Sequence, residues 1–197
     1  MEILSFDWNH ETGCGEQCEC CDKSEFHGFD WCELWLWSLR QSARFLGLDR
    51  VRIEHVLECP PSFFGYLYGE VGLQYHWVDR LSWTDEQIRQ YLSQSSVSLW
   101  VLYYTGASAG YFELRQHEDK SLEIAYFGLL KEFLGRSLGK HLLTVAVEQG
   151  WQLGATRLWV HTCSLDHSAA LPNYLKRGFK PFRQETYIVS VEDLFAK

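Results

Sequence analysis

The chain has 197 residues, of which 46% are hydrophobic and 16% aromatic, so it can bury one substantial core and is not mainly disordered. Its net charge of −8 argues against a nucleic-acid partner, because phosphate-binding surfaces are dominated by Lys and Arg. No apolar run reaches the ~20 residues of a membrane span, and the first residues lack the pattern of a secretory signal. We therefore expect a cytoplasmic protein that does not enter the membrane.

The N-terminal stretch 1–32 is rich in Gly, Cys, Asp and Glu and has no sustained hydrophobic period, so we expect an irregular tail. Several cysteines crowd into this stretch, and without a secretion signal we expect them to be reduced. With His27 they offer enough ligands for a tetrahedral zinc site, but Cys18 and Cys21 form a C-x2-C pair that no second pair follows. We predict no metal site and keep zinc binding as the alternative.

Residues 31–46 carry apolar side chains at helical spacing, which predicts a short helix. Its excess of Trp indicates that this helix packs on the rest of the protein. We therefore divide the chain into an N-terminal extension, residues 1–48, and a main domain, residues 49–197.

In the main domain, stretches rich in β-branched and aromatic residues alternate with stretches of helical period, which predicts a mixed α/β fold. Thr84 is the expected cap of one helix, and Gly178 the expected end of another, in which Pro172 would form a kink. The predicted elements are strand 50–57, helices 60–72 and 84–94, a meander of strands 96–105, 110–116 and 122–130, helix 138–153, strand 157–163, helix 168–178, and one or two strands in 179–190.

The stretch EFLGRSLGKHLL, residues 132–143, places glycines and cations between a predicted strand and a predicted helix. A nucleoside-triphosphate loop needs G-x4-G-K-[ST], but only three residues separate Gly135 from Gly139, and His141 replaces the required hydroxyl. The dinucleotide fingerprint G-x-G-x-x-G is also absent. What remains is a turn before a helix N-terminus, whose free N–H groups and positive dipole end can hold a pyrophosphate.

The same stretch resembles motif A of the GNAT superfamily of acetyl-CoA-dependent N-acetyltransferases, usually written [RQ]-x-x-G-x-[GA]. Gly135 and Gly139 match, whereas Leu134 replaces the usual Arg or Gln and Ser137 the usual inner glycine. Because backbone N–H groups hold the anion, a small serine is compatible with the motif.

The stretch HSAALPNYLKRGF, residues 167–179, is similar to motif B of the same superfamily, whose helix ends in G-F. Ala170 and Tyr174 match, and His167 stands at the usual Asn. Together with YFGL and HTCSLDH, this stretch resembles an uncharacterised bacterial branch of the superfamily. By the resemblance, coenzyme A would contact Leu129, Leu130, Gly135, Arg136, Ser137, Leu138, Gly139, Lys140 and His167.

The resemblance covers residues 50–190 and implies a mostly antiparallel central sheet flanked by helices. It also implies an enzyme that moves the acetyl group of acetyl-CoA directly to a primary amine on a small molecule, a peptide or a protein. The alternative is a non-catalytic acyl-CoA-binding module of the same fold. The sequence does not identify the acceptor or the oligomeric state.

Acetyl transfer to an amine requires a proton acceptor for the amine and a proton donor for the leaving thiolate. Strand alternation predicts Glu123 on one face with Ala125, Phe127 and Leu129, where Ala125 would leave space beside the carboxylate. The stretch EIAYFGL also resembles the part of the histone-acetyltransferase branch that carries its general base. Glu123 is therefore the first candidate for the base, with a solvated glutamate as the alternative interpretation.

His161 is the second candidate for the base, because an imidazole of ordinary pKa near ~6.5 accepts protons at neutral pH. A histidine in an apolar strand can equally be a core residue. Tyr174 matches the motif B tyrosine that in many relatives protonates the thiolate, and aromatic packing is its alternative role.

The acceptor side is expected in YHWVDRLSWTDEQ, between the first two helices of the main domain. Its aromatic rings and carboxylate either cage an ammonium group or cap the hydrophobic core. The residues concerned are Tyr75, Trp77, Asp79, Arg80 and Trp83.

Overall fold

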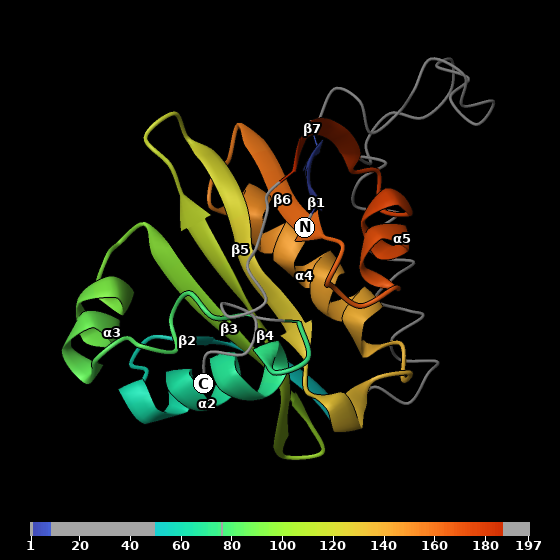
Figure 1. Ribbon diagram of the computed structural model, residues 1–197. Coiled ribbons are helices and arrows are strands. Elements are labelled where there is room, and N and C mark those ends of the chain that lie inside the picture. Colours follow the sequence, from blue (N-terminus) through green and yellow to red (C-terminus); the bar gives the residue numbers. More distant parts are fainter. Residues whose placement is uncertain (1, 9–49, 76, 187–197) are drawn as a thin grey trace, which may run out of the picture.

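The computed structural model describes residues 2–8, 50–75 and 77–186, which form a seven-stranded sheet with helices on both faces (Figure 1). The strand order is β2-β3-β4-β5-β6-β1-β7, and only β5 and β6 are parallel neighbours. The strands are β1 (Glu2–Trp8), β2 (Val51–Val56), β3 (Val97–Tyr104), β4 (Ala107–Gln116), β5 (Ser121–Leu129), β6 (Arg157–Cys163) and β7 (Lys180–Thr186). The predicted mixed, mostly antiparallel architecture is confirmed.

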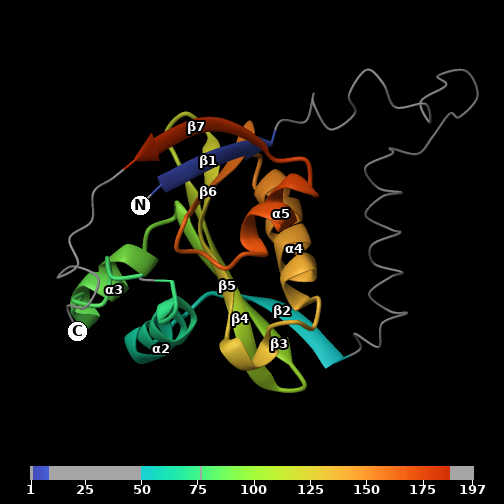
Figure 2. The ribbon, with the colours of Figure 1, turned by 45° about the vertical axis from the view of Figure 1, so that its right-hand side comes forward.

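Two pairs of helices lie on opposite faces of the sheet (Figure 2). The helices are α2 (Pro61–Gly72), α3 (Asp85–Leu92), α4 (Leu138–Gln152) and α5 (Ala170–Leu175), with a short 3-10 turn at Lys131–Phe133. Apolar side chains of α2 and α3 form one core with β3 and β4, and those of α4 and α5 form another with β4, β5 and β6. No helix in the described ranges is long and apolar enough to cross a membrane.

The helix ends follow the local sequence signals. Thr84 caps α3 through a capping box, in which its hydroxyl accepts from the Gln87 N–H and the Gln87 side chain accepts from the Thr84 N–H. Helix α5 is shorter than predicted, and Pro172 lies in its first turn, where a missing N–H breaks no helical hydrogen bond. The expected kink at Pro172 is therefore absent, while Gly178, at φ +85°, follows the helix end.

Strand β1 corrects the expectation of an irregular N-terminal tail. It lies between β6 and β7 and pairs antiparallel with both, and Phe6 is 1% exposed in the core. Seven residues are too few to show a sustained period, and their partners in β6 lie at least 150 positions away. Residues 9–49, with the cysteine cluster and the expected helix 31–46, lie outside the described residues, so the division at residue 48 stays a prediction.

A register shift in β5 decides where the site lies. Glu113 of β4 stands opposite Tyr126, and Leu114 stands opposite Ile124, so Ala125 is an extra residue, as in a β-bulge. Parallel pairing with β6 covers only Ser121–Ile124 of β5, although both strands continue beyond this point. The two neighbouring strands therefore separate directly after the shift.

The same shift shows that the expected strict alternation is wrong. Glu123 shares the face of Tyr126, towards α2 and α3, whereas Phe127 and Leu129 pack in the core beneath α4. One extra residue reverses the alternation, because the side-chain period of a strand is two. Glu123 therefore does not share a face with Phe127 and Leu129.

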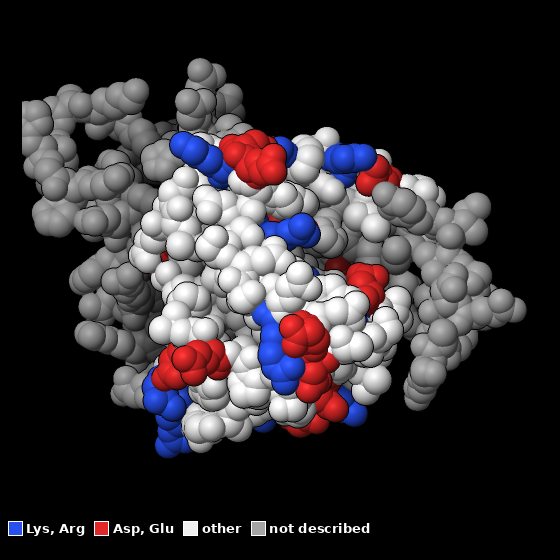
Figure 3. Space-filling view, turned by 90° about the vertical axis from the view of Figure 1, so that its left-hand side faces the viewer, with Lys and Arg blue, Asp and Glu red and all other residues white. Residues whose placement is uncertain are grey.

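The exposed side seen in Figure 3 carries acidic and basic side chains close together. On α3, Arg89 lies 3.6 Å from Asp85 and 3.5 Å from Glu86. Such exposed pairs contribute little to stability, roughly 0.3–0.5 kcal/mol each. The described part of this side shows no continuous basic surface.

Candidate active site

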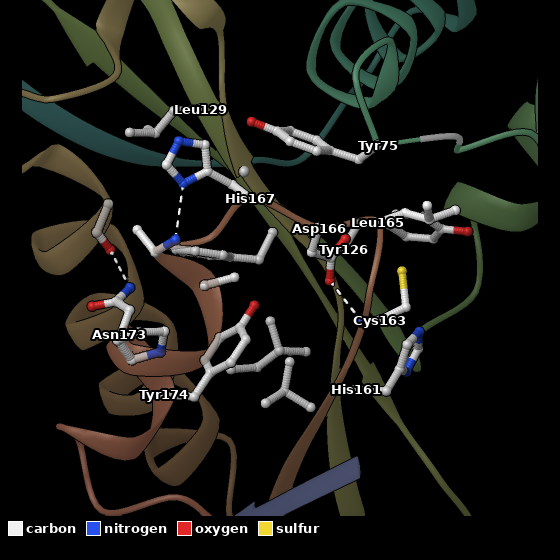
Figure 4. A pocket seen from close by; sticks show the side chains of 18 of the residues that line it. Tyr75, Tyr126, Leu129, His161, Cys163, Leu165, Asp166, His167, Asn173 and Tyr174 are labelled. Atoms are coloured by element: carbon white, nitrogen blue, oxygen red, sulfur yellow. Dashed lines mark hydrogen bonds between the residues drawn. The ribbon is translucent and has the colours of Figure 1, made fainter. Parts of the chain in front are cut away.

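A cavity of about 840 Å³ opens where β5 and β6 separate. Its walls come from the first turn of α4, from α5, from the linker between α2 and α3, and from the turn after β6 (Figure 4). Of the predicted site residues, those that line it are Leu129, Gly135, Ser137, Leu138, Gly139, Lys140, His161, His167 and Tyr174.

The N-terminus of α4 forms one end of the cavity. Ser137 precedes the helix in the left-handed conformation, at φ +61°, and Gly135 lies at φ +75°. The Ser137 side chain does not cap the helix. Free N–H groups of the first turn, together with the positive end of the helix dipole, therefore face the cavity. Lys140 adds a positive charge. This end suits an anionic group such as a pyrophosphate.

Asn173 of α5 and Arg177, just after this helix, bind backbone carbonyl groups in the first turn of α4. The Asn173 side chain donates to the Gly139 carbonyl at 3.3 Å, and Arg177 donates to the Lys140 carbonyl at 2.7 Å and to the Asn173 side chain. Asn173 and Arg177 also line the cavity but were not predicted as site residues. The signal available in the sequence was the run of polar and basic residues that ends motif B.

Two predicted coenzyme A contacts do not reach the cavity. The Leu130 N–H donates to the Ala109 carbonyl, and its own carbonyl accepts from the Phe133 N–H, both at 2.9 Å. Arg136 instead stacks over aromatic rings, 5.6 Å from the centroid of Tyr104 and 5.5 Å from that of Phe133. Both backbone groups of Leu130 thus have partners within the protein, and the predicted contacts of Leu130 and Arg136 with coenzyme A stay predictions.

The two candidate bases form one unit. Nδ1 of His161 lies 3.3 Å from Oε1 of Glu123, and Oε2 of Glu123 lies 3.0 Å from Nε2 of His117. His161 lines the cavity with a half-exposed side chain, whereas the Glu123 side chain is 10% exposed and lies behind it. The structure therefore brings the imidazole of His161, and not the carboxylate of Glu123, to the cavity.

Electrostatics support this arrangement. Burial alone would raise the pKa of Glu123, but the hydrogen bonds and charges of His161 and His117 outweigh it and hold the pKa below its usual value. The hydrogen bond to Glu123 raises the pKa of His161, against the opposing effect of burial. Glu123 is thus an anion that makes His161 a stronger base than a free imidazole.

Tyr174 rises from α5 with its hydroxyl directed towards the middle of the cavity (Figure 4). The residue is 4% exposed, and its ring meets Phe127 and Phe179 edge to face, with centroids 6.2 and 6.0 Å apart. Burial raises the pKa of Tyr174 above its usual value, so its hydroxyl stays protonated. Aromatic packing and a proton-donating hydroxyl coexist in this residue.

His167 also lines the cavity, where its Nδ1 accepts from the Ala169 N–H at 3.1 Å. The ring meets Tyr75 edge to face, with centroids 6.4 Å apart (Figure 4). This contact connects the motif B helix with the linker between α2 and α3.

The predicted acceptor cluster is divided by the structure. Tyr75, Trp77 and Asp79 line the cavity, but Arg80 does not. Arg80 is 9% exposed and forms a two-fold ion pair with the fully buried Glu113, at 2.7 and 3.0 Å. The linker is therefore anchored to β4 by Arg80, which presents the residues before it to the cavity.

Trp83 belongs to this anchor and not to the cavity wall. The Arg80 guanidinium lies 4.9 Å from the centroid of Trp83 and 4.3 Å from that of Tyr126. The sequence could not reveal this role, because the charged partner of Arg80 lies 33 positions away.

Carboxylates gather at the end of the cavity opposite the α4 N-terminus. Asp79 accepts from the Tyr126 hydroxyl at 3.2 Å, and Asp166 accepts from the Thr162 hydroxyl at 2.6 Å and from the Cys163 N–H at 3.0 Å. Asp166 was not predicted as a site residue, although its place just after a strand was visible in HTCSLDH. The cavity thus has a cationic end and an acidic end.

The model of the acetyltransferase (GNAT) family matches residues 53–179, which is more than half of the chain. The chain belongs to this family. It is an acetyltransferase, and acetyl-CoA is its acyl donor. The predicted acetyl-CoA-dependent N-acetyltransferase is confirmed at this level, while the roles of single residues stay predictions.

Solved structures show the same fold. An IAA acetyltransferase from Bacillus cereus is 25% identical over 68% of this chain and 79% of that chain, with a TM-score of 0.52. An acetyltransferase from Bacillus subtilis in complex with CoA is 22% identical over 66% and 76%, with a TM-score of 0.51. An aminoglycoside acetyltransferase from an uncultured soil metagenomic sample, in complex with sisomicin, is 15% identical over 73% and 97%, with a TM-score of 0.58. No curated protein matches the chain.

Proposed function

We propose that this acetyltransferase moves an acetyl group directly from acetyl-CoA to a primary amine of a cationic acceptor. The main observation behind this proposal is that one cavity is lined by the uncapped N-terminus of α4, the imidazole of His161 and the hydroxyl of Tyr174. The α4 N-terminus and Lys140 would hold the pyrophosphate of coenzyme A. The acceptor would enter from the acidic end.

His161 acts as the general base in this proposal. An amine of pKa near ~10.4 is almost fully protonated at neutral pH and must lose a proton before it attacks. Because the Glu123 anion accepts from Nδ1–H, Nε2 of His161 carries the free lone pair. Nε2 takes the proton, and Glu123 stabilises the resulting imidazolium. This assigns Glu123 to a supporting role and His161 to the contact with the acceptor.

Tyr174 acts as the proton donor to the thiolate that leaves. Its hydroxyl lies in the cavity and remains protonated at neutral pH, because burial disfavours the phenolate. A proton released at this point completes coenzyme A as a free thiol. His161 and Tyr174 therefore handle different protons of the same reaction.

The acceptor is proposed to carry positive charge besides its reacting amine. Asp79 and Asp166 come from different walls of the cavity, and both carboxylates raise the pKa of His161 through their charge. Tyr75 adds an aromatic ring that can contact a cationic group. One solved structure that shares the fold is an aminoglycoside acetyltransferase in complex with sisomicin. This likeness of fold supports a cationic acceptor.

Thiol release from acetyl-CoA tests the proposal. We expect the purified full chain to release thiol in the presence of sisomicin, 1,4-diaminobutane or a peptide with a free N-terminus. Benzyl alcohol, a neutral control without an amine, should give no release. Product mass spectrometry should show one added acetyl group on the amine. Binding of coenzyme A by calorimetry without turnover of any amine would instead support the non-catalytic acyl-CoA-binding module.

The cellular setting is also proposed. Among the described cysteines, Cys59 and Cys163 are free, and thiols persist in a reducing compartment. We therefore propose a cytoplasmic location, which fractionation of cells producing the full chain would test.

A further inference from the structure

Glu123 is bonded from two sides, and the function proposed above uses only one of them. His117 follows β4 in the turn before β5, and its Nε2 lies 3.0 Å from the Glu123 oxygen that His161 leaves free. The His117 side chain is one-third exposed, whereas that of Glu123 is 10% exposed. A buried carboxylate thus stands between a cavity histidine and a surface histidine.

The proton positions in this unit follow from the carboxylate. An ionised carboxylate can only accept, so His117 must donate through Nε2–H and His161 through Nδ1–H. The ring of Trp159 lies beside both imidazoles, with centroids 5.4 Å from His117 and 6.3 Å from His161. The described residues contain no group of side chains suited to hold a metal ion.

Loss of the His117 side chain would leave Oε2 of the buried Glu123 carboxylate without its hydrogen-bond donor. Such an oxygen is costly, and the carboxylate would rotate towards His161, its remaining donor. This movement changes the direction from which Glu123 accepts the His161 Nδ1–H. The orientation of the cavity imidazole therefore depends on His117, which does not line the cavity.

We propose that His117 is a positioning residue for acetyl transfer, which fixes the Glu123 carboxylate and through it the tautomer and orientation of His161. This inference rests on the proposed role of His161 as the base. His117 touches neither acetyl-CoA nor the acceptor in this scheme. By its hydrogen bond to Glu123, His117 sets how strongly the negative charge of this carboxylate acts on His161.

Other charges near the unit come from three further elements. Asp79 of the linker and Asp166 of the turn after β6 act on His161, and Asp119 interacts with His117. Arg115 of β4 stands opposite Glu123 in the strand register. These groups remain unchanged in the variants below, so they contribute a constant background.

The unit predicts pH shifts of opposite sign for its two members. Without the His117 donor, more of the carboxylate charge acts on His161, so the pKa of His161 rises. In Glu123→Gln the anion is lost, so the pKa of His161 falls. Because the neutral imidazole is the active form, kcat/KM increases as pH rises through this pKa. The acid limb should therefore move to higher pH in His117→Phe and to lower pH in Glu123→Gln.

Turnover of the full chain with acetyl-CoA and sisomicin gives the first readout. We expect His117→Phe to lower kcat at neutral pH by about tenfold, with the KM for acetyl-CoA unchanged. His117→Gln keeps an amide donor and should recover most of the loss. His55→Phe is the matched control, because His55 stacks on Trp100 at 4.6 Å on β2, away from the cavity.

Nitrogen-detected NMR of the imidazoles, recorded without substrate, gives a readout independent of turnover. We expect the Nδ1–H tautomer for His161 in the unchanged protein, and a raised His161 pKa in His117→Phe. An unaltered His161 pKa and tautomer in folded His117→Phe would overturn the inference. Altered NMR titration with full activity in every variant would leave the positioning intact and refute His161 as the base.

Discussion

The two ends of the cavity are built in different ways. The cationic end, proposed as the cofactor end, presents backbone N–H groups of one short segment, which is shaped by the left-handed Gly135 and Ser137. The acidic end, where the acceptor is proposed to enter, presents side chains, of which Asp79 lies more than 80 positions before His161 and Asp166. Backbone recognition needs residues that are small and consecutive, so it leaves a readable motif. Side-chain recognition needs only proximity in space, so it does not.

The two ends also differ in charge, and in the proposed function this difference would orient the two substrates. Lys140 and Arg177 stand at the cofactor end, and carboxylates stand at the acceptor end. An anionic cofactor and a cationic acceptor would therefore enter in one relative orientation. In the proposed function, that orientation would bring the acceptor amine beside His161 and the leaving thiolate near Tyr174.

The largest expected effect comes from the point where the two ends meet. His161→Asn removes the proton acceptor but keeps a polar side chain, so kcat at neutral pH should fall by roughly 10²- to 10⁴-fold. The loss should shrink as pH approaches the pKa of the acceptor amine, which then arrives deprotonated. Steady-state thiol release across pH measures this, and unchanged kcat in a folded variant would contradict the assignment.

A negative charge at the cofactor end should weaken acetyl-CoA binding and leave the acceptor end intact. At Gly139 a Cβ would meet only Leu129, at 3.6 Å, so Gly139→Asp fits sterically but repels the pyrophosphate. We expect affinity to fall roughly 10- to 100-fold by calorimetry, as for the loss of one or two charge-assisted contacts. Gly69→Asp in α2, where a Cβ meets nothing within 4 Å, is the matched control. Equal affinity of both variants would remove the pyrophosphate from this helix end.

A change at the acceptor end should have the opposite selectivity. Asp79→Asn keeps an oxygen that can accept from Tyr126 but removes the charge. Because Asp79 is exposed, we expect the KM for sisomicin to rise only about 2- to 5-fold, with the KM for acetyl-CoA constant. Glu54→Gln on β2 serves as the control for loss of one surface charge. A larger effect on acetyl-CoA than on sisomicin would reverse the proposed polarity.

The smallest effect concerns the serine that departs from motif A. A non-glycine residue in the left-handed region is strained, so Ser137→Gly should raise the free energy of unfolding by up to about 1 kcal/mol. Because the N–H groups remain in place, coenzyme A affinity should stay within about twofold. Chemical denaturation and calorimetry measure the two quantities. Destabilisation together with weaker binding would show that the Ser137 side chain itself contacts the cofactor.

Much of the molecule was predictable from local sequence. The Thr84 capping box and the three strands of the meander are encoded by neighbouring residues. Motifs A and B identified the α4 N-terminus and Tyr174 as cavity residues, because each motif lies within one short segment. These features depend on interactions over a few positions, which sequence patterns record directly.

Tertiary structure decided the remainder. The extra residue Ala125 reverses the side-chain order of β5 and places Glu123 behind His161, and no local pattern marks such a bulge. Strand β1 and the anchor formed by Arg80 and Glu113 likewise join segments far apart in the chain. The sequence by itself therefore determined the order of elements from residue 50 onward and the proposed cofactor end of the cavity. The base and the acceptor end depended on long-range pairing, because side chains from several elements meet there only after the chain has folded.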